Sequence, residues 1–105
     1  SQNGHDVILV DSSIWVDHLK LGNPALIRLL ERGRVVIHAF VVGELTLGGL
    51  RPQSPAALLL QDLPPAILAS HEEVMYCIHA YKLKGSGIGY VDAHLLASTL
   101  LGKYT

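Results

Sequence analysis

One stretch constrains the fold more than any other, residues 7–20, with the sequence VILVDSSIWVDHLK. Its first four residues are apolar and three of them are β-branched, which predicts a short strand buried on both faces. The strand leads directly to Asp11, and helical spacing of apolar residues begins at Ile14. An acid after a first buried strand lies where open α/β sheets place their functional groups, but Asp is also a preferred N-cap residue. This stretch alone leaves both interpretations of Asp11 open.

The composition indicates a single globular α/β domain. Half of the 105 residues are apolar and 16% are charged, so a substantial core is expected. A second β-branched run at 35–37 follows two helical patterns, which predicts parallel strands joined by helical crossovers. Residues 66–69 are a candidate third strand. We place the domain at 7–105 and interpret 1–6 as an expression remnant or a disordered start.

The charge and cysteine content limit the partners and the compartment. The net charge of −1 gives no overall field that attracts nucleic acid, and the candidate phosphate contacts, Arg51, Lys82 and Lys84, form no basic cluster. A nucleic-acid partner would need a local basic patch, and the residues of such a patch stay unknown. No apolar run approaches the ~20 residues of a membrane span. Cys77 is the single cysteine, so we expect a core position for it and a reducing, cytoplasmic location.

Three acids stand out against apolar surroundings. Asp11 follows the first strand, Glu44 is the single charge in the helical pattern of 39–50, and Asp92 opens a helical pattern at 90–102. Glu44 either faces solvent or points into a polar site. The carboxyl ends of parallel strands and the amino ends of crossover helices meet at one edge, so these acids can gather there. Clustered carboxylates repel unless they share protons or bind a cation, and oxygen ligands favour Mg²⁺ or Mn²⁺.

The segments around these acids resemble a PIN domain. They are DSSIW at 11–15, EL at 44–45 and GIGYVDAHLLAS at 87–98, in that order along the chain. More narrowly, the chain resembles a VapC-type ribonuclease toxin of a bacterial toxin–antitoxin system, over about residues 7–102. Within the last segment, His94 points to a different helix face from Asp92 and is interpreted as a structural or a surface residue rather than a catalytic one.

The resemblance carries specific expectations. It implies a three-layer α/β/α fold with a central parallel sheet, and a Mg²⁺- or Mn²⁺-dependent endoribonuclease in which metal-activated water attacks an RNA phosphate. It implies that Asp11, Glu44 and Asp92 are catalytic metal ligands, and that the Ser13 hydroxyl has a supporting role. The implied partners are the RNA substrate and a cognate antitoxin that covers the acidic pocket. A homodimer is also possible.

The end of the chain departs from the family pattern. PIN domains carry a fourth acid after a further strand, and residues 102–105 could begin that strand, but no residue here matches the acid. We therefore expect the last strand to be missing or truncated. Two alternatives to an active toxin follow. One is a catalytically inactive PIN-like fragment or binding module, and the other is a generic α/β domain whose acids are caps and surface residues.

Overall fold

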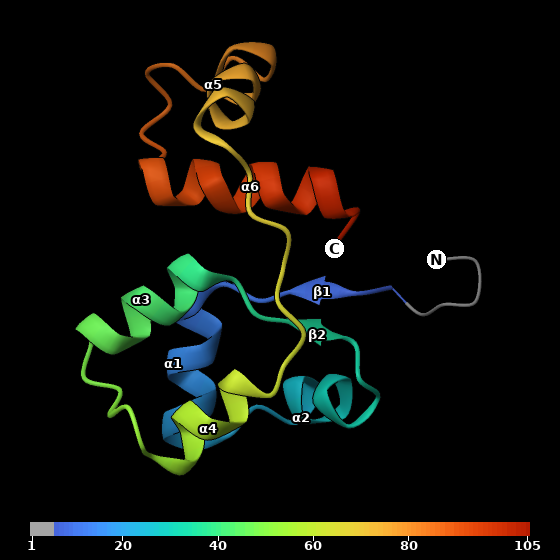
Figure 1. Cartoon of the computed structure of the whole chain (residues 1–105), viewed down its shortest axis with the longest axis vertical. Helices are drawn as coiled ribbons and strands as arrows, with labels where there is room; N and C mark the ends of the chain where they lie inside the picture. Colours follow the sequence, from blue (N-terminus) through green and yellow to red (C-terminus); the bar gives the residue numbers. More distant parts are fainter. Residues whose placement is uncertain (1–5) are drawn as a thin grey trace.

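The computed structural model describes residues 6–105, and over that range six helices surround a short parallel sheet (Figure 1). The elements in chain order are β1 (Ile8–Leu9), α1 (Ser12–Leu21), α2 (Pro24–Glu31), β2 (Val35–Val36), α3 (Ala39–Leu47), α4 (Pro55–Gln61), α5 (His71–Ala80) and α6 (Tyr90–Gly102). The predicted α/β class is confirmed. Residues 1–5 of the expected start at 1–6 lie outside the described range.

The two strands form the parallel pair that the β-branched runs predict. Ile8 lies opposite Val35 and Leu9 opposite Val36, with α1 and α2 as the helical crossover between them. The last residue, Thr105, extends this sheet along the outer edge of β1. Its N–H donates to the Val7 carbonyl (2.9 Å) and its carbonyl accepts from the Leu9 N–H (3.3 Å). This is parallel pairing between the two ends of the described chain.

The prediction of a third strand at 66–69 is wrong. On the outer side of β2, pairing is limited to one bridge between Ile37 and Pro65. Beyond this bridge the chain of β2 continues through His38 into α3, which begins at Ala39, so it offers no strand partner for residues 66–69. The Ile67 N–H donates to the Tyr104 hydroxyl (3.0 Å) outside the sheet.

Side-chain caps set where several helices begin. Ser70 and Glu73 form the capping box that their spacing predicts, with the Ser70 Oγ accepting from the Glu73 N–H and a Glu73 carboxylate oxygen accepting from the Ser70 N–H. Asn23 caps α2 ahead of Pro24, which occupies the first turn. Gly33 follows α2 at a φ of +67°, a left-handed conformation that suits glycine, and turns the chain toward β2.

The apolar side chains form two separate cores. In Figure 1, α5 and α6 lie above the strands, and α1, α2 and α4 lie below them. The larger core joins the strands to α1–α4 and α6 through Val10, Trp15, Leu26, Val35, Ile37, Val41, Leu45, Leu60 and Leu95. The smaller core lies between α5 and α6 and consists mainly of Ala69, Val74, Cys77, Ala93 and Ala97. Cys77 is therefore buried, as predicted. Within the described range, no helix is long and apolar enough to cross a membrane.

Replacement of Trp15 by alanine tests the larger core. Trp15 is fully buried, so Trp15→Ala should lower the free energy of unfolding by roughly 3–5 kcal/mol. Urea unfolding followed by far-UV circular dichroism measures this, because the variant has lost the only tryptophan. Leu21→Ala is the control, since Leu21 lies on the same helix with 90% of its surface exposed and should change stability by less than ~0.5 kcal/mol. Equal effects of the two substitutions would contradict this assignment of the core.

Candidate active site

Asp11 caps α1 at the carboxyl end of β1. Its backbone is extended, and its Oδ2 accepts hydrogen bonds from the Ser13 backbone N–H (3.4 Å) and the Ser13 hydroxyl (2.8 Å). The carboxylate remains exposed to solvent. The two interpretations of Asp11 are thus compatible, because the residue caps a helix and also presents a negative charge beyond the strand. Ser13 holds that carboxylate in one orientation.

Glu44 lies in α3 and faces solvent, which is the first of the two alternatives that the sequence allows. Within residues 6–105 its carboxylate has no hydrogen-bond or ion-pair partner. Glu44 does not lie on a flat surface, however. It lines a hollow of about 280 Å³ between α1 and α3, together with Val16 and Lys20 of α1. A cation or a polar ligand can therefore reach it.

Asp92 occupies the first turn of α6. Gly89, the N-cap residue, offers no side chain to the free N–H groups of this turn, and the positive end of the helix favours a carboxylate there. The Asp92 side chain is exposed and has no partner among the described residues. His94, two positions further on, is buried with 7% of its surface exposed, which agrees with its interpretation as a structural residue.

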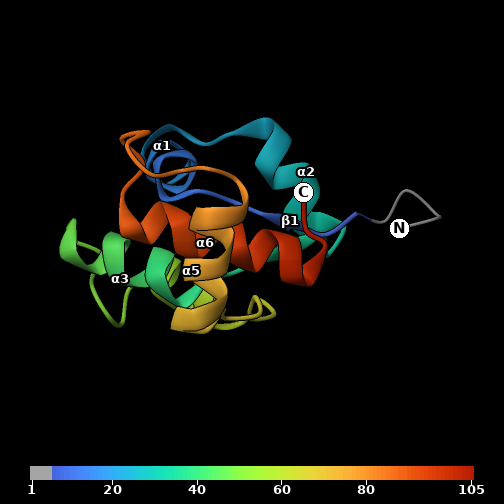
Figure 2. The same cartoon turned by 90° about the horizontal axis from the view of Figure 1, so that it is seen from above.

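The elements that carry the three acids meet at one end of the domain. The carboxyl end of β1 and the amino ends of α3 and α6 lie on the left in Figure 1, and Figure 2 shows the start of α6 beside α1 and α3 from above. Among residues 6–105, no three His, Cys, Asp or Glu side chains lie close enough together to hold a metal ion. Carboxylate oxygens suit Mg²⁺ or Mn²⁺. The donor chemistry therefore fits the predicted ion, although three ligands are not assembled around one point.

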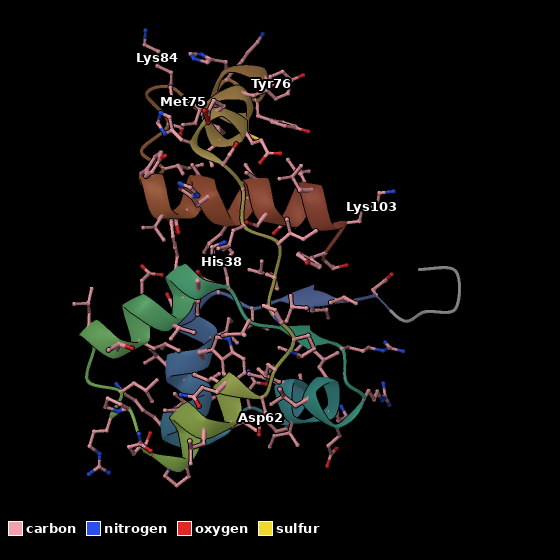
Figure 3. All side chains as sticks on the ribbon, in the orientation of Figure 1. His38, Asp62, Met75, Tyr76, Lys84 and Lys103 are labelled. Carbon is pink, nitrogen blue, oxygen red and sulfur yellow. The ribbon has the colours of Figure 1, made fainter. Side chains whose placement is uncertain are left out.

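A buried hydrogen bond joins the start of α3 to α6. Figure 3 shows His38 between these two helices, where its Nε2 lies 2.9 Å from the Ser98 Oγ. The His38 Nδ1 accepts from the Phe40 backbone N–H (3.0 Å) and so caps α3. Because Nδ1 is an acceptor, the neutral ring carries its proton on Nε2 and donates it to Ser98. His38 thus connects the helix that contains Glu44 to the helix that contains Asp92.

Burial keeps both histidines of this region neutral. It lowers the pKa of His38, and the neighbouring His94 lowers that pKa further. Burial also lowers the pKa of His94, with a smaller contribution from the charge that His71 can carry. Sequence reasoning missed His38 because its partner lies 60 positions away. The available signals were a histidine directly after a β-branched strand and a serine, Ser98, within an apolar helical pattern.

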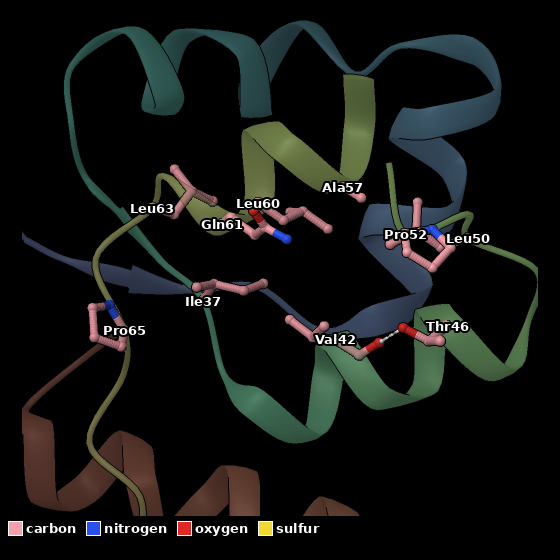
Figure 4. Close-up of a pocket in the computed structure, with 10 residues that line it drawn as sticks. All are labelled: Ile37, Val42, Thr46, Leu50, Pro52, Ala57, Leu60, Gln61, Leu63 and Pro65. Carbon is pink, nitrogen blue, oxygen red and sulfur yellow. Dashed lines mark hydrogen bonds between the residues drawn. The ribbon is translucent and has the colours of Figure 1, made fainter. Parts of the chain in front are cut away.

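A further cavity lies apart from the three acids. It has a volume of about 480 Å³ and lies between α3, α4 and the segment after α4 (Figure 4). Its lining is mostly aliphatic and includes Ile37, Val42, Leu60 and Pro65, with the amide of Gln61 and the hydroxyl of Thr46 as polar groups. The Thr46 hydroxyl is already bonded to the Val42 carbonyl. None of the three acids contacts this cavity.

A parallel α/β domain with acids after β1, within α3 and at the start of α6 is compatible with the PIN class. Ribonuclease VapC32, found in two strains of Mycobacterium tuberculosis, is 36% identical to this chain over 95 residues, which cover 90% of the chain and 77% of the relative. The chain therefore belongs to the VapC-type family of PIN-domain ribonucleases. No family model and no solved structure matches it.

The lowered pKa of His38 predicts how stability depends on pH. An unfolded histidine takes up a proton below about pH 6.5, whereas folded His38 resists protonation, so the folded state loses stability as the pH falls below that value. Urea unfolding at several pH values between about 7.5 and 5 should show this loss, and the loss should be smaller in His38→Gln. The pH dependence of stability that remains in His38→Gln then reflects the lowered pKa of His94. The same pH dependence in both proteins would contradict the assignment.

Proposed function

We propose that this chain is an endoribonuclease that hydrolyses RNA phosphodiesters with Mg²⁺ or Mn²⁺, as the toxin of a type II toxin–antitoxin module. The observation that carries the proposal is the 36% identity to a ribonuclease. The similarity extends over 90% of the chain, so it is not confined to one motif. The positions of Asp11 after β1 and of Asp92 in the first turn of α6 support the proposal, since these two element ends lie at one end of the domain.

We propose Asp11, Glu44 and Asp92 as the metal ligands and Ser13 as a supporting residue. Three exposed carboxylates repel one another when no cation is present, so their separation in the isolated chain is compatible with ligands that close around an ion. Mg²⁺ also retains several waters and needs only one or two carboxylates from a protein. The bound ion would activate water and stabilise negative charge on the phosphate.

The residues of the chain have distinct tasks in this proposal. The Ser13 hydroxyl orients the Asp11 carboxylate, and that orientation is maintained because the same carboxylate caps α1. The amino end of α6 adds its positive end to the region of Asp92. His38 fixes the first turn of α3 against α6, which limits how far Glu44 moves relative to Asp92.

The proposal also includes the layer arrangement of the fold and the binding partners of the protein. Helices on both sides of the strands support the three-layer α/β/α arrangement of a PIN domain. The proposed partners are the RNA substrate, a cognate antitoxin and a second copy of the chain. A hollow of about 320 Å³ between α5 and α6, with Tyr76, Leu100 and Leu101 in its wall, provides apolar surface for a protein partner.

RNA cleavage tests the proposed activity. The wild-type chain should cut an end-labelled RNA pool in Mn²⁺ and not in EDTA, and Asp11→Asn and Asp92→Asn should each reduce the rate by roughly 100-fold or more. Asp11→Asn is informative because asparagine also caps helices well, so the change removes charge more than structure.

The matched control for cleavage is Asp62→Asn. Asp62 is an exposed acid at the end of α4, on the opposite side of the molecule from α6 (Figure 3), and its replacement should leave the rate unchanged. Equal rates in wild type and in Asp92→Asn would contradict the assigned site. No cleavage by the wild-type chain would instead favour the inactive binding module.

Metal binding can be tested without activity. At about 100 times its Kd, Mn²⁺ should raise the free energy of unfolding of the wild-type chain by about 2.7 kcal/mol. Asp11→Asn and Asp92→Asn should lose most of this increase, and Asp62→Asn should keep it. Thermal unfolding across a Mn²⁺ titration measures the effect. An identical increase in all four proteins would place the ion elsewhere.

A further inference from the structure

Four aromatic rings form a continuous row across the acidic end of the domain. Phe40 of α3 lies against His94 of α6, with ring centroids 4.6 Å apart, and His94 lies against Tyr90 at 4.5 Å. Tyr90 in turn lies beside His71 at the start of α5, at 6.0 Å. We call these four residues the aromatic row. Three helices, α3, α5 and α6, contribute to it.

Two rings of the row, Phe40 and Tyr90, are exposed. Tyr90 has 47% of its surface exposed and Phe40 has 37%, while His94 between them is buried. The Tyr90 hydroxyl lies 2.6 Å from the His71 Nδ1, which fixes the outer end of the tyrosine ring. An exposed aromatic ring that is already oriented loses little conformational freedom when a flat ligand stacks on it.

The row lies next to the proposed ligands without containing them. Phe40 and Glu44 are four residues apart on α3 and therefore share one helix face. Tyr90 and Asp92 share the first turn of α6 but point to different faces, because residues two apart do not face each other. A ligand on the row would thus lie beside the acids and would not cover them.

We propose that the aromatic row stacks an unpaired base of single-stranded RNA, next to the phosphate that the acids cleave. Proteins hold single strands by stacking bases on aromatic side chains, and every base has a face that can stack. Stacking does not depend on charge, which suits a chain whose net charge of −1 gives no overall attraction for phosphates. This inference rests on the proposed function and specifies how the site binds its RNA substrate.

RNA binding in a cleavage-deficient background tests the inference. In the Asp11→Asn chain, fluorescence anisotropy with a labelled single-stranded RNA gives the Kd. Adding Tyr90→Ala should weaken binding on the order of tenfold, and Tyr90→Leu should weaken it similarly because leucine has bulk but no aromatic face. Tyr90→Phe should bind like the parent. Tyr81→Ala is the control, because Tyr81 is an exposed tyrosine at the opposite end of α5 from His71.

A second binding experiment identifies the stacked base. A series of RNAs, each with the base removed at one position, should reveal one position where base removal weakens binding to the parent but not to Tyr90→Ala. Binding by Tyr90→Ala or Tyr90→Leu that equals the parent overturns the inference, and so does a parent that does not bind RNA. Cleavage by the wild-type chain is measured separately. Absent cleavage with Tyr90-dependent binding would overturn the proposed activity and leave the stacking surface in place.

Discussion

The buried hydrogen bond between His38 and Ser98 is the contact on which the arrangement of this domain depends. It joins the start of α3, which belongs to the larger core, to the middle of α6, which also carries the smaller core. Both side chains are almost completely buried, so loss of either partner leaves a polar group without water or protein to bond with. Because the Nδ1 of the same imidazole accepts from the Phe40 N–H to cap α3, the ring must stay unprotonated at Nδ1. The protonation state of His38 is therefore linked to the relative position of α3, which carries Glu44, and α6, which carries Asp92.

Local signals in the sequence predict most of the helices but not the extent of the sheet. The capping box at Ser70 and the proline at the start of α2 act within a few residues, so their consequences can be recognised from spacing alone. The segment after Pro65 has the apolar composition of a strand, yet it pairs only at the bridge with Ile37, because the neighbouring chain turns into α3 at Ala39. The length of the neighbouring strand leaves no periodic signal in residues 66–69.

The sequence likewise predicts one part of the candidate site and not another. The elements that carry Asp11, Glu44 and Asp92 could be placed at one end of a parallel sheet from strand and helix order. Their side-chain distances could not, since each carboxylate is exposed and its position depends on charge repulsion and on any bound cation. The aromatic row was also missed, because Phe40, Tyr90 and His71 come from three helices and no spacing relates them.

The pairing of Thr105 with β1 has a consequence for the order of folding. The helices α1–α4 can collapse onto the strands early, since their contacts join neighbouring segments. The outer edge of β1 must wait for a residue almost the whole described length away. On a ribosome, β1 is therefore made long before Thr105 and keeps this backbone edge unpaired until Thr105 has been added. During that interval the nascent chain exposes a strand edge with which another polypeptide can pair.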